Sequence, residues 1–255
     1  MYQHGGDIYT NQNMLDFSAN INFRGMPVTV REAARAAVDD AVHYPDVRCR
    51  ALKRAIAEME GVPETSIFCG NGAADVIGSL VRAVKPKRAL LPVPSFYEYR
   101  RALESVGCEV TTYVIRGEDG FQLREDILEK ITEETDLIFL CNPNNPTGLL
   151  TDRDLMKRIL ERCETTGTLL VADECFMDLT EEPERFSLLP EVGKSDQLFV
   201  LKAFTKTFAM PGLRLGYGIC RDAALLQAME EVSQPWSVSV PAQAAGVAAA
   251  AEQAY

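Results

Sequence analysis

Short apolar segments alternate with amphipathic segments through most of the chain. The apolar runs cover residues 66–69, 88–92, 108–114, 137–141, 168–172, 197–201 and 215–219. Several of them, such as LIFLC at 137–141, are apolar at every position, which is typical of strands buried on both faces of a parallel sheet. Amphipathic segments predicted as helices accompany them at 73–84, 96–106, 123–131, 152–165 and 222–233. The alternation predicts an α/β fold with a mostly parallel central sheet and helices on both faces.

The two ends of the chain have other patterns. Residues 1–25 are polar and rich in Gly and Asn, which predicts an extended arm. Two helices are predicted after it, one from Pro27 to about Ala41 and one from Arg48 to Glu60, which Gly61 should terminate. The segment AAGVAAAAEQAY at the end of the chain reads as a helix cut off in mid-course, so we expect the chain to be a fragment.

Composition narrows the classes of function. The net charge of −11 disfavours a nucleic-acid-binding surface. No apolar run approaches the roughly 18 residues of a membrane helix, and the N-terminus lacks a signal-peptide pattern. Seven cysteines without a C-x-x-C motif are interpreted as buried free thiols, which predicts a cytoplasmic protein. Because His4 and His43 are the only histidines, a multi-histidine metal site is excluded, a Ser-His-Asp triad is disfavoured and no metal is expected.

Candidate chemistry is concentrated in residues 200–217, which read VLKAFTKTFAMPGLRLGY. Lys202 and Lys206 lie in a predicted loop after the strand at 197–201, and Arg214 follows Lys206 by eight residues. A lysine that attacks a carbonyl carbon must be held as a neutral amine, and a phosphate group needs a fixed cation with backbone donors nearby. A loop with both features indicates a phosphorylated aldehyde cofactor, pyridoxal 5′-phosphate (PLP). The alternative for this stretch alone is a basic, solvated loop.

Unusual residues also follow the other predicted strands, at the carboxyl ends where open α/β sheets bind ligands. GNGAAD after 66–69 is a glycine-rich turn into a helix, whose first amides form an anion site. Phe96 follows 88–92, an asparagine loop with two prolines follows 137–141, and Asp173 follows 168–172. Each feature alone could be an ordinary turn, core residue or helix cap. Together they predict one site with a phosphate cradle, an aromatic ring, an amide, a carboxylate, a lysine and an arginine.

The motifs NNPTG at 144–148 and TKTFAMPGLRLGY at 205–217 resemble those of the aspartate aminotransferase superfamily of PLP-dependent enzymes, fold type I. The resemblance covers nearly the whole chain. It implies that Lys206 forms the Schiff base and that Asp173 pairs with the pyridine nitrogen, so both are candidate catalytic residues. Asn145 would bind the ring 3′-oxygen, and Phe96 would stack on the ring. The cofactor phosphate would be bound by Gly72, Ala73, Ala74, Thr205 and Arg214, together with Tyr44 of a neighbouring subunit.

The same resemblance implies the organisation of the molecule. Residues 1–62 would form an arm and helices that contribute to a small domain and to a dimer contact. Residues 63–255 would form the PLP-binding large domain, truncated at its C-terminal end, with the C-terminal small domain missing. The position of Tyr44 implies a homodimer with shared active sites.

Three further segments indicate the class of substrate. They are HGGD at 4–7, DFSANIN at 16–22 and QPWSVSVPAQAA at 234–245. They resemble the threonine-phosphate decarboxylases of cobalamin synthesis, whose nearest sister family is histidinol-phosphate aminotransferase. The resemblance implies an amino-acid phosphate substrate in contact with His4, Gly5, Asn20 and Asn145. It predicts PLP-dependent decarboxylation of L-threonine O-3-phosphate to (R)-1-aminopropan-2-yl phosphate.

Two alternatives stay open: amino transfer from histidinol phosphate to 2-oxoglutarate, and a PLP-binding remnant without catalytic activity. The sequence departs from the family pattern at two places. Phe176 stands where aminotransferases have a tyrosine, which removes a donor to the ring oxygen. Asn22 is followed by Phe23 instead of the usual proline, which changes the expected geometry of that loop.

Overall fold

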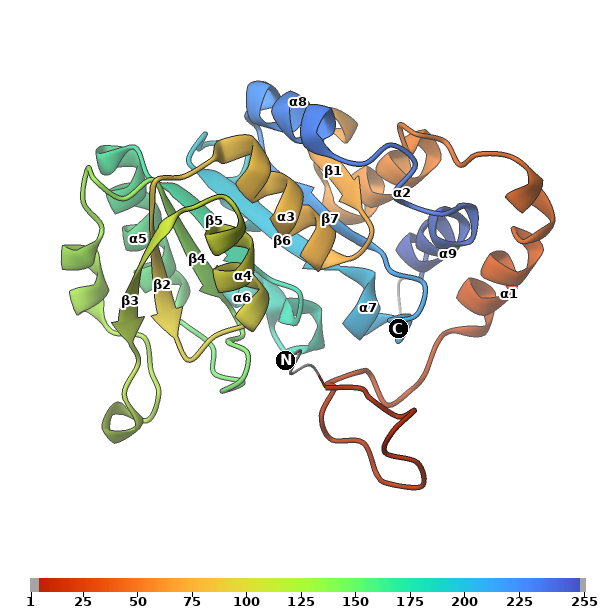
Figure 1. Ribbon diagram of the computed structural model, residues 1–255, viewed down its shortest axis with the longest axis horizontal. Coiled ribbons are helices and arrows are strands. Elements are labelled where there is room, and N and C mark those ends of the chain that lie inside the picture. The colour runs from red at the N-terminus through yellow and green to blue at the C-terminus, as the bar shows by residue number, and fades with distance from the viewer. Residues whose placement is uncertain (1–4, 253–255) are drawn as a thin grey trace.

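Within residues 5–252, which this computed structural model describes, seven strands form one sheet at the centre of the fold (Figure 1). They are β1 (Ile67–Gly70), β2 (Arg88–Val93), β3 (Glu109–Val114), β4 (Leu137–Cys141), β5 (Leu169–Asp173), β6 (Leu198–Ala203) and β7 (Gly216–Ile219). Their order across the sheet is β1-β7-β6-β5-β4-β2-β3. Only β7 runs antiparallel to its neighbours, β1 and β6, among these described strands. The predicted mostly parallel sheet is therefore confirmed.

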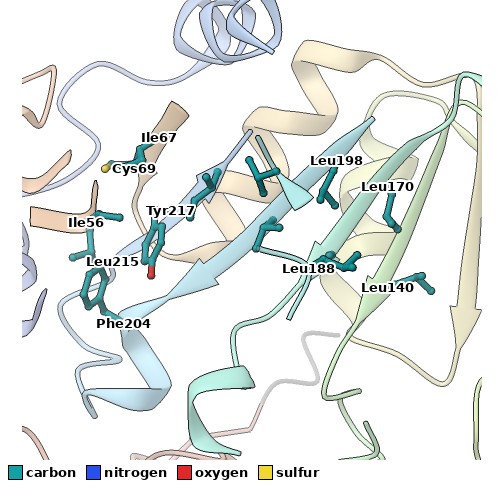
Figure 2. Packing of buried hydrophobic residues seen from close by; sticks show 14 of the residues in the cluster. Ile56, Ile67, Cys69, Leu140, Leu170, Leu188, Leu198, Phe204, Leu215 and Tyr217 are labelled. Atoms are coloured by element: carbon teal, nitrogen blue, oxygen red, sulfur yellow. The ribbon is translucent and has the colours of Figure 1, made fainter. Parts of the chain in front are cut away.

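Successive side chains of the strands enter two separate cores, one on each face of the sheet. In β5, Leu170 and Ala172 face one core, whereas Leu169 and Val171 face the other. The first core is closed by α2 (Arg50–Glu60), α5 (Arg153–Thr166) and α9 (Val240–Ala250), and Figure 2 shows part of it. The second is closed by α3 (Ala73–Val84), α4 (Tyr97–Ser105) and α8 (Ala223–Val232). Helices on both faces explain why β4 is apolar at every position and why most positions of β5 and β6 are apolar.

The N-terminal helices share the first core with the last described helix. Helix α1 (Val28–Ala36) packs on α9, and α9 also packs on α2 (Figure 1). The contact is close at Gly246, where an added Cβ atom would lie 2.6 Å from Cδ1 of Leu52 and 2.5 Å from Cδ2 of Leu215. The division of the chain at residue 62 stays a prediction, because both of its parts contribute to this core.

Several predicted elements need correction. The helix expected from 27 to 41 ends at Ala36, and a separate 3₁₀ turn, η1 (Asp39–Val42), follows it. The segment 123–131, predicted as a helix, contains the 3₁₀ segment η4 (Glu125–Lys130). Strand β6 continues to Ala203, so Lys202 is a buried strand residue paired in register with Tyr217 of β7, and the predicted loop position is wrong. Tertiary packing overrides local helix and loop propensities at these three places.

Shorter elements connect the main ones. They are η2 (Glu64–Ser66), η3 (Gly117–Asp119), η5 (Met177–Leu179), α6 (Pro183–Phe186), η6 (Leu189–Glu191) and α7 (Phe204–Thr207). Residues 5–24 form turns and bends that extend from the body as a loop, drawn in red in Figure 1. Across residues 5–252, every helix is too short or too polar to cross a membrane.

Candidate active site

The predicted site residues follow strand ends that lie along one edge of the sheet. Strands β1, β2, β4, β5 and β6 are parallel to one another, so the loops after their carboxyl ends share that edge. Antiparallel β7 begins at the same edge, where Gly216 pairs with Gly70 and Ala203. Arg214, which precedes β7, is thereby brought to the loops that carry Gly72 and Lys206.

The guanidinium group of Arg214 rests on the backbone at the N-terminus of α3. A Cβ atom added at Gly72, whose φ is +83°, would lie 2.3 Å from Nη2 of Arg214, so only glycine fits here. Within the described chain, the amides of Ala73 and Ala74 donate to no protein acceptor. Arg214 itself has a positive φ of 60° and donates to the carbonyl of Pro211 over 3.0 Å. Two free amides beside a fixed cation form an anion-binding cradle.

Lys206 lies in α7, directly after β6, with a half-buried side chain. Burial lowers the pKa of its amine; the cation of Arg214 also lowers it, and the thiol of Cys175 acts in the opposite direction. Its Nζ atom lies 5.6 Å from the centre of the Phe176 ring. The residue that departs from the family pattern therefore faces the lysine with an apolar ring. A lowered pKa raises the fraction of neutral amine, the form that attacks a carbonyl carbon.

Asp173 ends β5 and is only 4% exposed. One carboxylate oxygen accepts from the Tyr99 hydroxyl over 2.5 Å, and the other accepts from the backbone amide of Cys175 over 2.9 Å. Burial raises the pKa of the carboxyl, and these two hydrogen bonds partly oppose the increase. Tyr99 is itself fixed, because its ring stacks on Phe139 with centroids 4.6 Å apart. The carboxylate is thus held rigidly and can accept a further hydrogen bond.

Two further predicted residues lie in the loops after β2 and β4. The Phe96 ring meets Tyr99 edge-on, with centroids 5.6 Å apart. Asn145 is half-buried in the loop after β4, and its side-chain amide has no hydrogen-bond partner in the part of the chain described. The neighbouring Asn144 fixes this loop by donating to the carbonyl of Pro94 over 3.2 Å. The aromatic ring and the free amide therefore come from loops that are tied together.

Lys202, the other lysine of the motif, has a different environment. Its Nζ atom lies 2.9 Å from carboxylate oxygens of both Glu60 and Asp178, inside the protein. Burial disfavours its charge, but the two carboxylates outweigh burial and raise the pKa of Lys202 well above its usual range. The Tyr217 hydroxyl also donates to Glu60. A lysine held charged in this way is a structural cation and not a nucleophile.

The other predicted residues have no described hydrogen bond or ring contact with the Lys206 side chain. Tyr44 is 78% exposed, and its ring stacks on Trp236 with centroids 4.6 Å apart. Gly5 packs against Ser18 within the N-terminal loop, where an added Cβ atom would lie 1.8 Å from the Ser18 carbonyl oxygen. Asn20 is exposed in the same loop, and His4 lies outside the described residues. Thr205 is buried next to Lys206. The roles of all these residues stay predictions.

Two residues that contact or adjoin Lys206, Asn22 and Thr207, have no marked role in the sequence pattern. The backbone amide of Asn22 donates to the Lys206 carbonyl over 3.1 Å, and its side-chain amide donates to the Thr207 carbonyl over 2.9 Å. Thr207 has a buried hydroxyl with no hydrogen-bond partner in the described structure. Asn22 ends the motif DFSANIN at 16–22, where the sequence indicated only that Phe23 replaces the usual proline.

Comparisons with known proteins find similar sequences and a similar fold. The family model described as aminotransferase class I and II matches residues 12–255. A threonine-phosphate decarboxylase of Salmonella typhimurium is 40% identical over 99% of this chain and 71% of its own length. A histidinol-phosphate aminotransferase of Geobacillus thermodenitrificans is 31% identical over 100% of this chain and 71% of its own. The crystal structure of the histidinol-phosphate aminotransferase from Clostridium acetobutylicum matches with a TM-score of 0.86 and 29% identity, over 94% of this chain and 70% of that one.

Proposed function

Because this chain belongs to the aminotransferase class I and II family, we propose that it carries the PLP site of a threonine-phosphate decarboxylase. The reaction would be decarboxylation of L-threonine O-3-phosphate to (R)-1-aminopropan-2-yl phosphate, a step of cobalamin synthesis. The observation that carries the proposal is the position of Lys206, whose pKa is lowered, beside the anion cradle of Arg214 and Gly72.

The residues present fit PLP at both of its ends. The free amides of Ala73 and Ala74, together with Arg214, suit a phosphate dianion. At the other end, Asp173 is a buried carboxylate with its pKa raised by burial, so a protonated ring nitrogen would be a favourable partner. Thr205 and the unpartnered hydroxyl of Thr207 offer further donors next to Lys206.

PLP, when bound, supplies an electron sink for the pair left behind by a broken bond at the substrate Cα. The residues of this chain decide which bond breaks. Asp173 would keep the ring nitrogen protonated, Phe96 would fix the plane of the ring, and Asn145 would bind its 3′-oxygen. A carboxylate held perpendicular to that plane is lost as CO₂, and Lys206 can then deliver a proton to Cα.

The decarboxylase assignment is favoured over amino transfer by sequence similarity. Identity to the Salmonella decarboxylase is 40%, against 31% to the Geobacillus aminotransferase over similar lengths. The cradle at α3 would serve the cofactor phosphate, so the substrate phosphate would need other donors. We propose that Gly5, Asn20 and His4 of the N-terminal arm supply some of them.

The proposal extends to the assembly. An exposed Tyr44, whose ring stacks on Trp236, suits a residue that completes the phosphate site of a second subunit, so the protein would be a homodimer with shared sites. The proposed location is the cytoplasm. Residues 1–62 would be the arm and dimer-contact part, and 63–255 the PLP-binding part of a longer protein, since the chain spans about 71% of the two relatives.

Two product assays on the PLP-loaded enzyme separate the alternatives. The decarboxylase reading predicts CO₂ release from threonine phosphate without any keto acid. Glutamate formation from histidinol phosphate and 2-oxoglutarate, without CO₂ release, would identify an aminotransferase instead. A cofactor absorbance that no amino-acid phosphate changes would indicate a PLP-binding protein without activity.

A further inference from the structure

The ring of Phe176 faces Lys206 but has no polar group of its own to hold it there. Its centre lies 5.6 Å from Nζ of Lys206, and phenylalanine lacks the hydroxyl that a tyrosine would use for a hydrogen bond. The position of the ring therefore depends on packing and on the backbone segment that carries it. This segment follows β5 and continues into η5.

The segment is attached to β6 on both sides of Phe176. Before the ring, the backbone amide of Glu174 donates to the carbonyl of Leu201 over 2.8 Å. After the ring, a carboxylate oxygen of Asp178 lies 2.9 Å from Nζ of Lys202, the next residue of β6. Strand β6 leads directly into α7, which carries the amine that the ring faces. The ring and the amine are thus both positioned from the same two residues of β6.

The ion pair of Asp178 has a fixed partner. The side chain of Lys202 is only 7% exposed and is also held by Glu60, whose carboxylate lies 2.9 Å from the same Nζ atom. Surface ion pairs contribute little when two mobile side chains must both be ordered, and here the lysine is already ordered. The side chain of Asp178 is 38% exposed. Its loss leaves Lys202 paired with Glu60, so a variant at this position should still fold.

We propose that Asp178 is a positioning residue for Lys206. Through its ion pair with β6, Asp178 holds the ring of Phe176 against the Lys206 amine. This role assumes the proposed PLP site, in which Lys206 must be available as a neutral amine. An apolar ring beside Nζ keeps water away from it, and the exclusion of water disfavours the ammonium form.

Two possible effects of losing Asp178 have opposite signs. Burial is the main cause that lowers the pKa of Lys206, so this pKa should rise toward its ordinary value if the ring moves away and water reaches Nζ. Removal of a negative charge would by itself lower the pKa of an amine. The cation of Arg214 and the thiol of Cys175 also act on this pKa, and both are retained in a variant at position 178.

The test measures the pKa of Lys206 in the full chain without cofactor. The protein is acetylated with traces of acetic anhydride over a series of pH values, and labelling of Lys206 is followed by mass spectrometry. Asp178→Ala should raise the midpoint of the labelling curve by about 0.5 or more. Asp178→Asn, whose amide oxygen can still accept from Lys202, should give a smaller rise. Circular dichroism checks that each variant is folded.

Glu60→Gln is the matched control. It removes the charge of the other carboxylate that contacts Lys202, but it belongs to α2 and not to the segment that carries Phe176. It should lower stability and leave the midpoint of Lys206 labelling at that of the parent. An unchanged or lowered midpoint in Asp178→Ala, or an equal rise in Glu60→Gln, would overturn the proposal.

The same labelling separates this role from the proposed function. In the parent protein, saturating PLP should protect Lys206 from acetylation. Lack of protection would overturn the PLP site and the role of Asp178 with it. If PLP protects Lys206 but Asp178→Ala is labelled with the parent midpoint, the PLP site stands and only the positioning role is wrong.

Discussion

At the scale of single residues, the two lysines of one motif differ in the charge state that their surroundings favour. Lys206 is half-buried near a cation, which favours a neutral amine, whereas Lys202 lies between two carboxylates, which favour an ammonium ion. Their spacing of four residues gave no indication of this difference. The difference arises because β6 continues through Lys202 and ends before Lys206.

Replacement of Lys206 by alanine should abolish the visible absorbance of the bound cofactor, because Lys206 is the amine beside the anion cradle of Arg214 and Gly72. Lys202→Ala should retain that absorbance but destabilise the fold by about 3–5 kcal/mol, since Glu60 is left buried without its cation. Lys202→Arg keeps the charge and is the milder control. Absorbance spectra and urea unfolding check both expectations, and an absorbance that survives Lys206→Ala would refute the assignment.

Asn22 is expected to act as a positioning residue for Lys206. Asn22→Ala removes the side-chain hydrogen bond to the Thr207 carbonyl, so we expect kcat to fall about ten-fold with a small change in KM, and stability to fall by about 1 kcal/mol. Asn11→Ala is the matched control, because its amide also donates to a backbone carbonyl, that of Asp7, but far out on the exposed arm. Equal kinetic effects of the two variants would leave Asn22 a structural residue only.

The sequence predicted Lys206, Asp173 and Arg214 but not Asn22, and the reason is physical. The first three are side chains at strand ends, and the apolar strands before or after them mark those positions. Asn22 acts on backbone carbonyls 184 and 185 residues away. A backbone acceptor has no residue type, so nothing in the local sequence reveals the contact.

At the scale of elements, the apolar runs located each of the seven described strands. The clearest runs are those of β4, β5 and β6, which helices bury on both faces, whereas β3 is largely exposed. Boundaries were less accurate where a polar residue is buried with a partner, as at Lys202 in β6. The segment 123–131, predicted as a helix, contains a 3₁₀ segment, whose side chains contact other elements: Arg158 of α5 contacts Glu125, and Tyr113 of β3 donates to Asp126. Such long-range contacts leave no periodic signal.

The N-terminal loop provides a prediction about the substrate phosphate. Gly5→Ala should displace the loop, because the new Cβ atom would overlap the Ser18 carbonyl. If the loop binds the substrate phosphate, KM for threonine phosphate should rise several-fold while PLP affinity is unchanged. Gly193→Ala, at a position with open space around it, is the control and should alter neither quantity. Unchanged KM in the Gly5 variant would remove the loop from the substrate site.

Glu174 connects the end of β5 to the segment after α6 and should make stability depend on pH. Its carboxylate accepts from the Ser187 hydroxyl over 2.5 Å and from the Leu188 amide over 2.7 Å. Burial raises the pKa of this carboxyl from 4.5 to about 7. The folded state therefore binds the proton more tightly than the unfolded state, and its contribution to stability is full below pH 4.5 and is lost as pH rises through 7.

Glu174→Gln should remove up to about 3 kcal/mol of this decline between pH 4.5 and 7, as measured by urea unfolding at several pH values. The control is Glu191→Gln. Lysines 194 and 157 lower the pKa of Glu191 to about 2, so this carboxyl titrates below pH 4.5. Between pH 4.5 and 7, the change of unfolding free energy with pH should therefore be the same in this variant as in the parent protein. If the unfolding free energy of the Glu174 variant changed with pH as in the parent protein, Glu174 would not be the group responsible.

At the scale of the whole molecule, the proposal of shared sites predicts complementation between two defective subunits. Lys206→Ala removes the nucleophile of a subunit, and Tyr44→Phe removes the hydroxyl that would reach the site of its partner. Mixed dimers of the two would contain one intact site, so reassembled equal mixtures should recover about a quarter of the parent activity at limiting PLP. Lys206→Ala mixed with Asp173→Asn should recover none, because both residues serve the same subunit. Equal outcomes in both mixtures would exclude shared sites.

The antiparallel position of β7 determines when the anion cradle can form during synthesis. Strand β1 occupies an edge of the sheet and pairs only with β7 in the described structure, with Ile67 opposite Ile219. The hairpin of β6 and β7 is local, whereas β1 must wait until the ribosome has released residue 219. Until then Arg214 cannot rest on Gly72, so a nascent chain should be unable to capture its cofactor. Cofactor uptake would therefore occur late in synthesis, only after β1 has paired with β7.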